Sequence, residues 1–575
     1  MSREENVWDA WLREPRLDGG LRSELAALVG AGDRAELEER FAGDLQFGTG
    51  GMRAKMGAGT DRLNVHTVRK ASQGVAAWIA ARAEPDARRL AVCFDGRRQS
   101  REFALEAALV AARNGIAAYL FDAARPTPLL SFAVRFLGCA GGVMITASYN
   151  PPEYNGYKVY GSDGVQLLPA EAETIIGAMR AIPDLFAIAR ADEEEARRAG
   201  LLKSVPADVE EAYFAALRPL YSRSAPPLRI VYTPLHGTGL ALVPRALREA
   251  GFPDVRTVAL QSRLDPEFTH VQSPNPEEPR AYDLALAEAR AGGADLILAT
   301  DPDADRVGVM AKDGAGYRFF TGNEAGALLL DGYLRRLRRD GGLKPGATVI
   351  TTNVTSDFGA AVAASYGVDT VRVLTGFKYI GARIGDYERS GGRHFVFGYE
   401  ESVGYLALPF VRDKDSVQAA VLAAQVAAEH KAAGRTLAQA LAELFARFGH
   451  YGDRLLGFAF AGQSGAARME KLMDDLRRSP LSAPGLALSA IEDCLAGARV
   501  ALPAGARENL DLPSSDVLKF YFGERGWVAV RPSGTEPKLK VYIGVKARSE
   551  EESRERLALL ERAVEGRLAS YLSEE

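Results

Sequence analysis

Short apolar runs alternate with helix-like segments along most of the chain. Ala-, Leu- and Arg-rich segments with helical spacing include 101–115 and 242–251. Between such segments, runs rich in β-branched or aromatic residues and bounded by Gly, Pro or Asp predict strands over 90–95, 116–121, 141–146, 229–234, 295–300, 347–352 and 394–399. The alternation predicts an α/β protein with parallel or mixed sheets. Because ligands of such sheets bind beyond the carboxyl ends of strands, the turns after these runs are where chemistry is expected.

Changes of texture divide the chain into several parts. Its 575 residues exceed what one hydrophobic core usually supports. A charged helical segment gives way to a strand at "SAPPLRIVYTP", a new start follows at "GYRFFTGNEAG", and "HYGDRLLGFAF" opens a tail of different character. We therefore expect domains over 1–210, 211–318, 319–448 and 449–575.

The composition excludes several classes of partner. Hydrophobic residues make up 47% and charged residues 25% of the chain, as in soluble globular proteins. A net charge of −4 offers no surface for a polyanion, so we expect no nucleic acid partner. Cys93, Cys139 and Cys494 lack CxxC spacing, which indicates reduced core thiols and no zinc site. The amino terminus is charged throughout, and no uniformly apolar run approaches the roughly 18 residues of a membrane span, so a cytoplasmic protein with no membrane partner is expected.

The stretch "TASYNPPEYNGYKVY" holds one hydroxyl in a rigid setting. A predicted strand leads to Ser148, and the Asn-Pro-Pro sequence after it restricts the backbone. Ser148 is therefore a candidate nucleophile or phosphate acceptor, although a serine at such a place can also simply form a turn. Lys158 follows the pair Asn155-Gly156, which favours a hairpin turn that would fold the lysine back toward Ser148. The alternative is a solvated surface lysine.

The stretch "DLILATDPDADRVGVM" places carboxylates at alternate positions. Asp301, Asp303 and Asp305 indicate a hard divalent cation with oxygen ligands. A calcium loop of the EF-hand kind is excluded, because the flanking segments are strands and the required Gly and Glu positions hold Arg306 and Lys312. Mg²⁺ usually completes its shell with water or phosphate oxygens, and Arg306 is well placed to clamp the same phosphate. A solvated acidic turn is the alternative.

Two further turns carry polar groups that suit a phosphosugar. "RPSGTEPKLK" gathers hydroxyls, a glycine amide and cations, which together favour anion binding. "GYEES" puts Glu400 and Ser402 directly after a strand, where they could bind neighbouring sugar hydroxyls. Each of the two could instead be an ordinary structural turn.

These stretches, in this order, resemble the α-D-phosphohexomutase superfamily, in particular its long phosphoglucomutase/phosphomannomutase branch. The likeness includes "FGTGGMR" at 47–53 and "LTGFKYIG" at 374–381 and covers most of the chain. It implies three similar α/β mixed-sheet domains and a smaller C-terminal α+β domain around a central cleft. It also implies an intramolecular phosphotransferase that interconverts α-D-glucose 1-phosphate and glucose 6-phosphate through a phosphoserine, with some phosphomannomutase activity.

The resemblance assigns roles position by position. Ser148 would carry the phosphoryl group and, with Asp301, Asp303 and Asp305, hold one Mg²⁺. The implied catalytic residues are Ser148, Lys158 as general acid/base, Arg53, Arg97 and Arg306. The implied sugar contacts are Thr375, Gly376, Lys378, Glu400, Ser402 and Lys414, and the implied phosphate-binding loop contains Arg531, Ser533, Gly534, Thr535 and Lys540. The partners would be sugar phosphates, with glucose 1,6-bisphosphate as primer, and the protein a monomer or homodimer.

Two departures from the pattern leave questions open. Tyr149 stands where many relatives have His, and Val403-Gly404-Tyr405 replaces the Gly-His of the short bacterial enzymes, so the second acid/base group is unidentified. Alternatives within the superfamily are a phosphopentomutase or a glucose 1,6-bisphosphate synthase. Outside it are a metal-dependent sugar phosphatase and a catalytically dead phosphosugar-binding regulator. The retained serine, lysine and aspartates argue against the dead protein, and a second phosphate-binding loop argues against simple hydrolysis.

Overall fold

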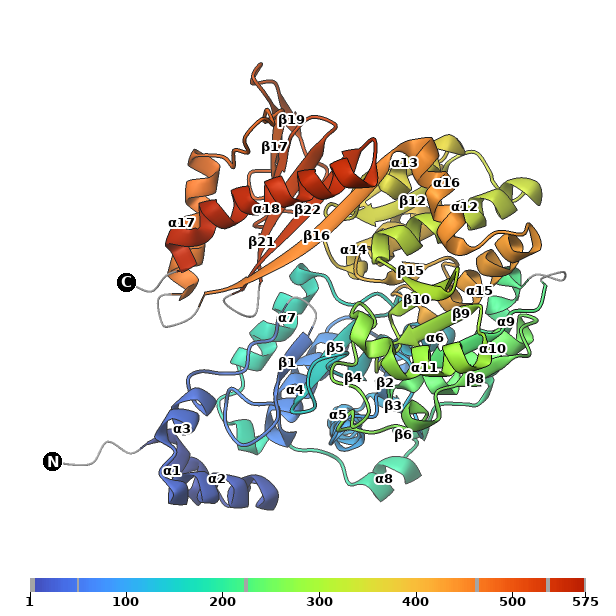
Figure 1. Ribbon diagram of the computed structural model, residues 1–575. Coiled ribbons are helices and arrows are strands. Elements are labelled where there is room, and N and C mark those ends of the chain that lie inside the picture. Colours follow the sequence, from blue (N-terminus) through green and yellow to red (C-terminus); the bar gives the residue numbers. More distant parts are fainter. Residues whose placement is uncertain (1–5, 49–50, 222–225, 461–464, 534–537, 573–575) are drawn as a thin grey trace.

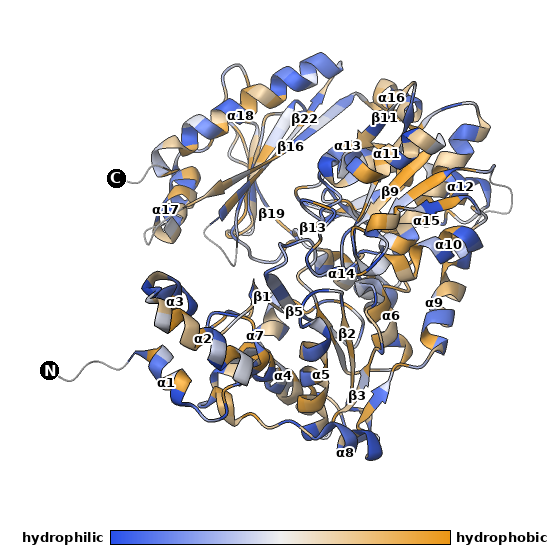
Figure 2. Cartoon of the chain, turned by 60° about the horizontal axis from the view of Figure 1, so that its bottom comes forward, coloured by the Kyte–Doolittle hydropathy of each residue, from blue (hydrophilic) through white to orange (hydrophobic). Residues whose placement is uncertain are grey.

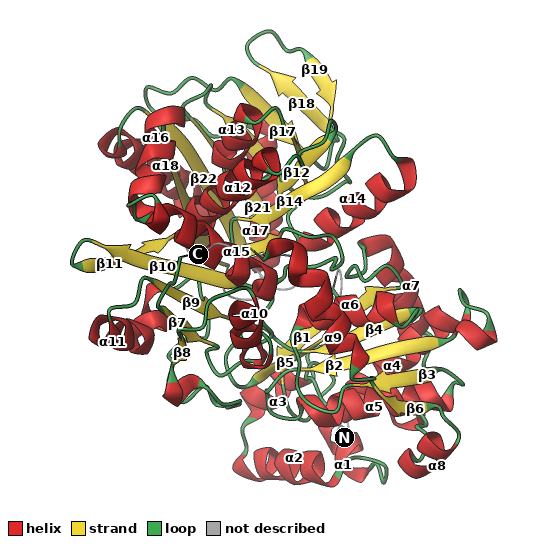
Figure 3. Ribbon diagram, turned by 90° about the vertical axis from the view of Figure 1, so that its right-hand side faces the viewer, coloured by secondary structure: helices red, strands yellow, loops and turns green. Residues whose placement is uncertain are grey.

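The computed structural model describes residues 6–48, 51–221, 226–460, 465–533 and 538–572, and this part of the chain forms four sheets that follow one another in sequence order. Figure 1 shows the chain running round the molecule in an arc from the first sheet to the fourth. Helices flank the strands on both sides in the first three units (Figure 3). The predicted α/β class with mixed sheets is confirmed. The division at 210, 318 and 448 stays a prediction.

The first sheet has the order β1-β5-β4-β2-β3-β6. Three pairings place β4, β2, β3 and β6 parallel, while β5 runs antiparallel to β4 and to β1. The strands are β1 (Gly51–Lys55), β2 (Arg89–Phe94), β3 (Ala117–Leu120), β4 (Gly141–Ile145), β5 (Tyr154–Gly161) and β6 (Leu202–Ser204). The helices are α1 (Val7–Arg13), α2 (Gly19–Ala31), α3 (Arg34–Arg40), α4 (Val65–Ala80), α5 (Ser100–Arg113), α6 (Thr127–Phe136), α7 (Pro169–Arg180) and α8 (Glu193–Arg198).

The second and third sheets repeat this mixed arrangement. The order is β11-β10-β9-β7-β8 in the second sheet and β13-β12-β14-β15 in the third, and each has antiparallel pairing at one side only. The second-unit elements are α9 (Asp208–Leu217), β7 (Ile230–Thr233), α10 (Val243–Glu249), β8 (Val255–Thr257), α11 (Asp283–Gly292), β9 (Leu296–Thr300), β10 (Val307–Asp313) and β11 (Gly316–Phe320). Those of the third are α12 (Gly322–Arg339), β12 (Ala347–Thr352), α13 (Asp357–Ser365), β13 (Asp369–Val373), α14 (Phe377–Ser390), β14 (His394–Glu400), β15 (Gly404–Leu406), α15 (Ser416–Ala432) and α16 (Leu437–Phe448).

The fourth sheet differs because all of its neighbouring strands are antiparallel, in the order β16-β22-β21-β20-β17-β18-β19. Its strands are β16 (His450–Ala459), β17 (Ala490–Asp493), β18 (Ala498–Ala501), β19 (Arg507–Asn509), β20 (Leu518–Tyr521), β21 (Gly526–Pro532) and β22 (Lys538–Ala547). Helices α17 (Gly465–Arg478) and α18 (Glu550–Leu572) complete the unit, and α18 lies across β16 and β22 (Figure 1).

Sequence pattern and structure agree closely in the interior. Each of the seven predicted strands is present, and helices α5 and α10 occupy the predicted segments. Strand β9 is buried along its whole length, and Figure 2 shows it in the hydrophobic colour. The three cysteines are free and buried, as predicted. None of the helices in the described residues is long and apolar enough to span a membrane.

Several buried clusters hold the molecule together, among them a core inside the first unit around Phe103 and Ile145. The largest buried cluster runs without a break through parts of the first unit and the second and third units, from Leu130 of α6 to Leu441 of α16. The fourth unit has its own core around Phe520. It joins the third unit through small clusters such as Val354 with Trp527 and Tyr542. The first three units therefore form one packed body, to which the fourth is attached by a smaller contact.

Candidate active site

Ser148 lies in a strained turn directly after β4. Its φ is 51°, in the left-handed region that a non-glycine residue enters at a cost of about 1 to 3 kcal/mol. The backbone N–H of Ser148 donates to Thr146 Oγ1 at 2.8 Å, and the residue is 4% exposed. Ala304 and Val403 have similar φ values of 53° and 52° in two other loops of the site. Strain of this kind is typical of functional turns whose surroundings hold them in place.

Two of the predicted arginines lie at this turn in different ways. The guanidinium of Arg97 is buried and donates to backbone carbonyls of the turn, including those of Ser148, Asn150 (2.6 Å) and Pro151 (2.9 Å). Arg97 therefore anchors the turn, because both of its Nη groups donate to backbone carbonyls of the protein. Arg53, on β1, is exposed and donates through Nη1 to Asn150 Oδ1 at 3.0 Å. A direct catalytic part for either arginine stays a prediction.

Lys158 reaches Ser148, although by a different route from the predicted one. Its Nζ lies 3.3 Å from Ser148 Oγ. The expectation of a hairpin turn at Asn155-Gly156 was wrong, because both residues lie inside β5 and the turn precedes them. Antiparallel pairing of β4 with β5, with Met144 opposite Lys158, brings the lysine back. Gly156 is needed for close approach, since a Cβ there would lie 2.4 Å from the Thr146 carbonyl oxygen.

The three aspartates converge beside Ser148. Asp301, Asp303 and Asp305 are all buried, and each offers a carboxylate oxygen within 4.8 Å of the others. Asp303 Oδ2 accepts hydrogen bonds from Ser148 Oγ at 3.1 Å and from Lys158 Nζ at 2.7 Å. The serine, the lysine and the acidic loop, which lie far apart in the sequence, thus form one cluster.

Each of the three aspartate carboxylates has one oxygen without a hydrogen-bond partner among the described residues. Asp301 Oδ1 accepts the backbone N–H of Arg306 and Asp305 Oδ2 lies 3.1 Å from Lys414 Nζ. The other oxygens, Asp301 Oδ2, Asp303 Oδ1 and Asp305 Oδ1, are buried with no hydrogen-bond partner among the described residues. Buried polar atoms are rarely left unsatisfied. Three buried carboxylate oxygens in such a position fit a hard cation such as Mg²⁺.

The buried charged groups of the cluster shift one another's pKa values. Burial, together with the nearby charges of Asp303 and Asp305, raises the pKa of Asp301 well above its usual range. Burial acts in the same direction on Asp303, but the ammonium of Lys158 and the hydrogen bonds to this carboxylate together outweigh it and lower its pKa. For Lys158 burial opposes the charged form, yet the two aspartates prevail and its pKa is raised. A divalent cation would relieve the excess negative charge on the acidic loop.

Arg306 is held at the edge of the cluster by three different loops. Its Nη1 donates to Glu277 Oε2 at 3.0 Å and to the Ser402 carbonyl at 3.2 Å. The ring of Tyr149 lies 4.8 Å below the guanidinium carbon, an arrangement that favours the cation electrostatically. Tyr149, which stands where many relatives have His, therefore packs on Arg306. Among the described residues, its side chain makes no hydrogen bond to the three aspartates. Glu277 was missed by sequence reasoning, although the rigid "SPNPEEP" around it is a possible signal.

The predicted sugar contacts gather on the third unit. Glu400 is 5% exposed and accepts the backbone N–H of Gly376 at 2.8 Å, which joins two of the predicted motifs. Thr375 donates to Asn353 Oδ1 at 3.2 Å. The Nζ of Lys414 lies 3.1 Å from Asp305 Oδ2 and 3.3 Å from Asp413 Oδ1. This predicted sugar contact therefore forms ion pairs with the acidic loop and with its own neighbour. Burial, then the charge of Arg531, lowers the pKa of Lys378 to about 8.

The fourth motif comes from the separate C-terminal unit. Arg531 on β21 pairs with Lys540 on β22, and Ser533 N donates to the Lys538 carbonyl at 2.7 Å. The predicted Gly534 and Thr535 lie outside the described residues. The charge of Arg531 is one of the two causes that lower the pKa of Lys378 in the sugar loop of the third unit. Hydrogen bonds and ion pairs connect the other three motifs, from Ser148 through the acidic loop to Glu400 and Ser402.

The second departure supplies no acid/base group of its own. Val403 and Tyr405 are buried, and the Tyr405 hydroxyl donates to the Gly322 carbonyl at 3.2 Å. Gly404 lies against the stem of Lys414, where any Cβ would come within 2.2 Å of that side chain. The segment therefore makes room for Lys414.

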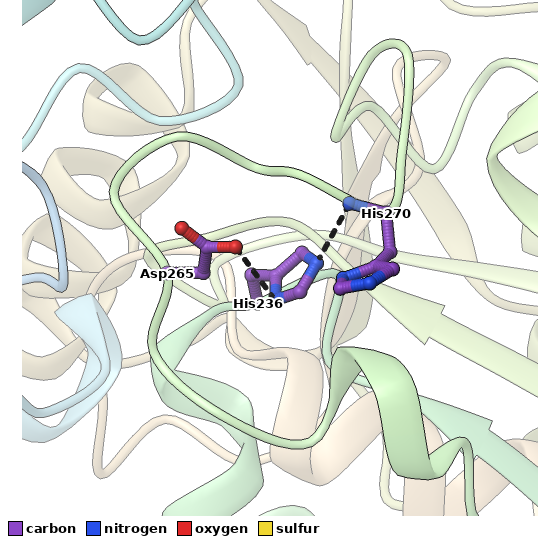
Figure 4. A group of neighbouring side chains, drawn as sticks. All are labelled: His236, Asp265 and His270. Carbon is purple, nitrogen blue, oxygen red and sulfur yellow. Dashed lines mark hydrogen bonds and ion pairs between the residues drawn. The ribbon is translucent and has the colours of Figure 1, made fainter.

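A second group of potential metal ligands, His236, Asp265 and His270, lies in the same unit as the acidic loop (Figure 4). Both ring nitrogens of His236 are already engaged: Nδ1 with the Arg263 carbonyl at 3.1 Å, and Nε2 with the backbone N–H of His270 at 3.3 Å. Since Nε2 accepts, Nδ1 carries the proton, and burial lowers the pKa of this imidazole. His236 is thus a hydrogen-bonded core residue, and the acidic triad is the better candidate for a metal.

The comparisons with known proteins agree with the motifs. Models of the phosphoglucomutase/phosphomannomutase family match α/β/α domain I at 44–185, domain II at 211–314, domain III at 321–448 and the C-terminal domain at 492–561. A phosphoglucomutase of Staphylococcus epidermidis is 39% identical over 517 residues, which is 89% of this chain and 92% of that protein. The chain belongs to the phosphoglucomutase/phosphomannomutase family. The resemblance inferred from the sequence is confirmed, and with it a mutase of the phosphohexomutase kind.

Further members of the family support the same placement. A phosphoglucomutase of Staphylococcus aureus (strain MSSA476) is 37% identical over 89% of this chain and 92% of its own. Parafusin from Paramecium, solved in an open form, superimposes with a TM-score of 0.67 at 18% identity, over 93% of this chain and 97% of that one. A phosphoglucomutase/phosphomannomutase family protein from Burkholderia thailandensis gives a TM-score of 0.65 at 18% identity, over 91% and 97%. At these identities the two structures establish the shared fold.

Proposed function

We propose that this member of the family is a Mg²⁺-dependent phosphoglucomutase that interconverts glucose 1-phosphate and glucose 6-phosphate. The observation that carries the proposal is the position of Ser148 Oγ, 3.1 Å from Asp303 and 3.3 Å from Lys158 in a strained, buried turn. A nucleophile beside a proton-carrying group and a cation site is what phosphoryl transfer requires. The similarity to staphylococcal phosphoglucomutases supports glucose as the sugar.

The side chains divide the work between binding and transfer. Asp301, Asp303 and Asp305 would hold Mg²⁺, which when bound would neutralise charge on the phosphoryl group. Lys158 would hold or deliver a proton at Ser148 Oγ, and at the sugar hydroxyl that exchanges the phosphoryl group with Ser148. Arg306 has its guanidinium fixed by Glu277 and would steady the phosphate on the serine.

The remaining motifs serve the second half of the reaction. The sugar bisphosphate must turn over between the two transfers, so that its other phosphate reaches Ser148. Glu400 and Ser402 would bind sugar hydroxyls, while Arg531 and the loop after it would hold the phosphate that is not being transferred. Glucose 1,6-bisphosphate would then act both as intermediate and as primer.

The first prediction concerns the covalent route. Ser148→Ala should lower turnover of glucose 1-phosphate by several orders of magnitude, since removing a nucleophile costs about 10⁴-fold or more in comparable enzymes. The variant should keep the wild-type unfolding temperature, and protein incubated with labelled bisphosphate should retain label only when Ser148 is present. Near-normal mutase activity in Ser148→Ala would rule out the proposal.

The second prediction concerns the cation and the primer. Treatment with EDTA should abolish turnover and Mg²⁺ should restore it, because three buried carboxylates would otherwise repel a phosphoserine. Dephosphorylated protein should show no mutase activity until a trace of glucose 1,6-bisphosphate is added. Release of free phosphate at the rate of sugar turnover would instead indicate a phosphatase.

A further inference from the structure

Thr127 is the first helical residue of α6, between Pro126 and Pro128, and it faces the acidic loop of the second unit. Its hydroxyl donates to Asp303 Oδ2 at 2.9 Å, and its backbone N–H donates to the Asp303 carbonyl at 2.9 Å. The residue has no exposed surface. One residue of the first unit therefore grips both the side chain and the backbone of a single aspartate in the second.

The grip determines which oxygen of Asp303 remains available. Thr127, Ser148 and Lys158 all bond to Oδ2, whereas Oδ1 is buried with no partner among the described residues. Of the three donors, Ser148 and Lys158 would take part in the reaction and change their partners. Thr127 has no such part, so its bond is the permanent one.

Thr127 is also held firmly itself. Helix α6 is buried from Thr127 to Val134, and its Ser131 donates to the Gly164 carbonyl at 2.7 Å and accepts from Arg412 N at 2.9 Å. The flanking prolines restrict the backbone at the start of the helix. A donor mounted this rigidly can fix the rotation of a carboxylate.

We infer that Thr127 is a positioning residue for the cation: its hydroxyl holds Asp303 in the rotation that turns Oδ1 toward the oxygens of Asp301 and Asp305. The inference rests on the proposed function, because it concerns the cation that the acidic triad would bind. Hydrogen bonds to ligating carboxylates orient them, and their loss typically lowers metal affinity about 10- to 100-fold.

The chain provides a matched control in Thr238. Its hydroxyl and backbone N–H donate to the Pro302 carbonyl of the same loop at 3.0 Å and 2.8 Å, but the hydroxyl reaches no carboxylate. Thr238→Val and Thr127→Val each remove one buried hydroxyl bond to the acidic loop and keep the amide bond. A role limited to supporting the loop would affect both variants alike.

The test measures cation binding directly. Mn²⁺ is titrated into dephosphorylated wild type, Thr127→Val, Thr127→Ser and Thr238→Val, with free Mn²⁺ read by electron paramagnetic resonance and the fold checked by thermal unfolding. We expect the Mn²⁺ dissociation constant to rise about 10- to 100-fold in Thr127→Val, and by less than about threefold in Thr127→Ser and Thr238→Val. The half-saturating Mg²⁺ concentration for turnover should shift in parallel.

The outcomes separate this inference from the proposed function. Thr127→Val with wild-type Mn²⁺ affinity, or an equal loss in Thr238→Val, would overturn the inference while leaving the mutase proposal intact. If Thr127→Val does not fold, Thr127→Ser still tests the inference. This variant keeps the hydroxyl, so a loss of Mn²⁺ affinity of about 10- to 100-fold in it would overturn the inference. Wild-type protein that binds no Mn²⁺ would contradict the metal in the proposed function itself, and the inference with it.

Discussion

At the scale of single residues, the site is governed by how buried charges are paired. Lys158 and Lys414 face the acidic loop, and the two cations offset part of the charge of three carboxylates. Lys378 differs, because its environment disfavours the charged form. Burial and the charge of Arg531 together lower its pKa to about 8. A phosphate near Lys378 would reverse that balance by supplying an opposite charge.

The resulting prediction is a pH dependence of substrate capture. Since the pKa of Lys378 in the free enzyme is lowered to about 8, its ammonium is charged below that pH and loses its proton as the pH rises through it. If Lys378 contacts the sugar phosphate, kcat/KM for glucose 1-phosphate should fall above pH 8. Lys378→Met should be slower at low pH and should lose this fall. A profile that declines in the same way in Lys378→Met would contradict the assignment.

At the scale of elements, hydrophobic pattern was a reliable guide where burial decides the structure. Strands such as β9 and β12 are buried at every position, so their apolar runs predicted them directly. Asn155-Gly156 misled because that pair also suits a strand where two backbones approach closely, and no local signal separates this from a turn. The motifs indicated Ser148 and the aspartates. Thr127 could not be found, because its role depends on a contact with a residue 176 positions away. Glu277, whose partner is 29 positions away, was marked only by the proline-rich segment around it.

A prediction at this scale concerns the loop that carries His236. His236→Ala removes two buried hydrogen bonds that hold this loop, and the loop in turn bonds to Pro302 through Thr238. We expect a loss of about 1 to 3 kcal/mol in the free energy of unfolding and reduced turnover.

The matched variant is His270→Ala. It keeps the backbone N–H that binds His236 and should therefore be nearly neutral in both measurements. A metal centre at this cluster would make the two variants equal, because each would remove one ligand. Metal content measured by mass spectrometry, beside chemical denaturation, distinguishes the two cases.

At the scale of the whole molecule, one large cluster links the first three units, beside the first unit's own core, and the fourth unit has a separate core. The contact between the third and fourth units includes Lys519, which is buried beside the ring of Trp527. The Nζ of Lys519 donates to the Asn353 carbonyl at 2.7 Å. Asn353 also accepts from Thr375 of the sugar loop. The fourth unit, which carries the loop after Arg531, is thus attached next to the place where the sugar would lie.

The choice of sugar is decided where these units meet. Glu400 is buried and oriented by the Gly376 amide. If it binds sugar hydroxyls as proposed, a sugar that lacks them would leave this carboxylate without those partners. The neighbouring Tyr399 lies on the opposite side of β14 from Glu400, buried against Gly326 and Gly359. It therefore gives no reason to prefer ribose. An unpaired buried group costs about 1 to 3 kcal/mol, or roughly ten- to over a hundred-fold in specificity.

We accordingly expect kcat/KM to decrease from glucose 1-phosphate to mannose 1-phosphate to ribose 1-phosphate under one set of Mg²⁺ and primer conditions. Glu400→Ala should narrow the gap between glucose and ribose. Glu401→Gln is the control, because the neighbouring carboxylate accepts from Thr352 and Thr355 at 3.3 Å and 3.2 Å and so serves the third unit's own structure. The control should preserve the order of the sugars even if it lowers stability. A preference of tenfold or more for ribose 1-phosphate would replace the glucose assignment with a phosphopentomutase, since the phosphoryl-transfer groups at Ser148 would serve either sugar equally well.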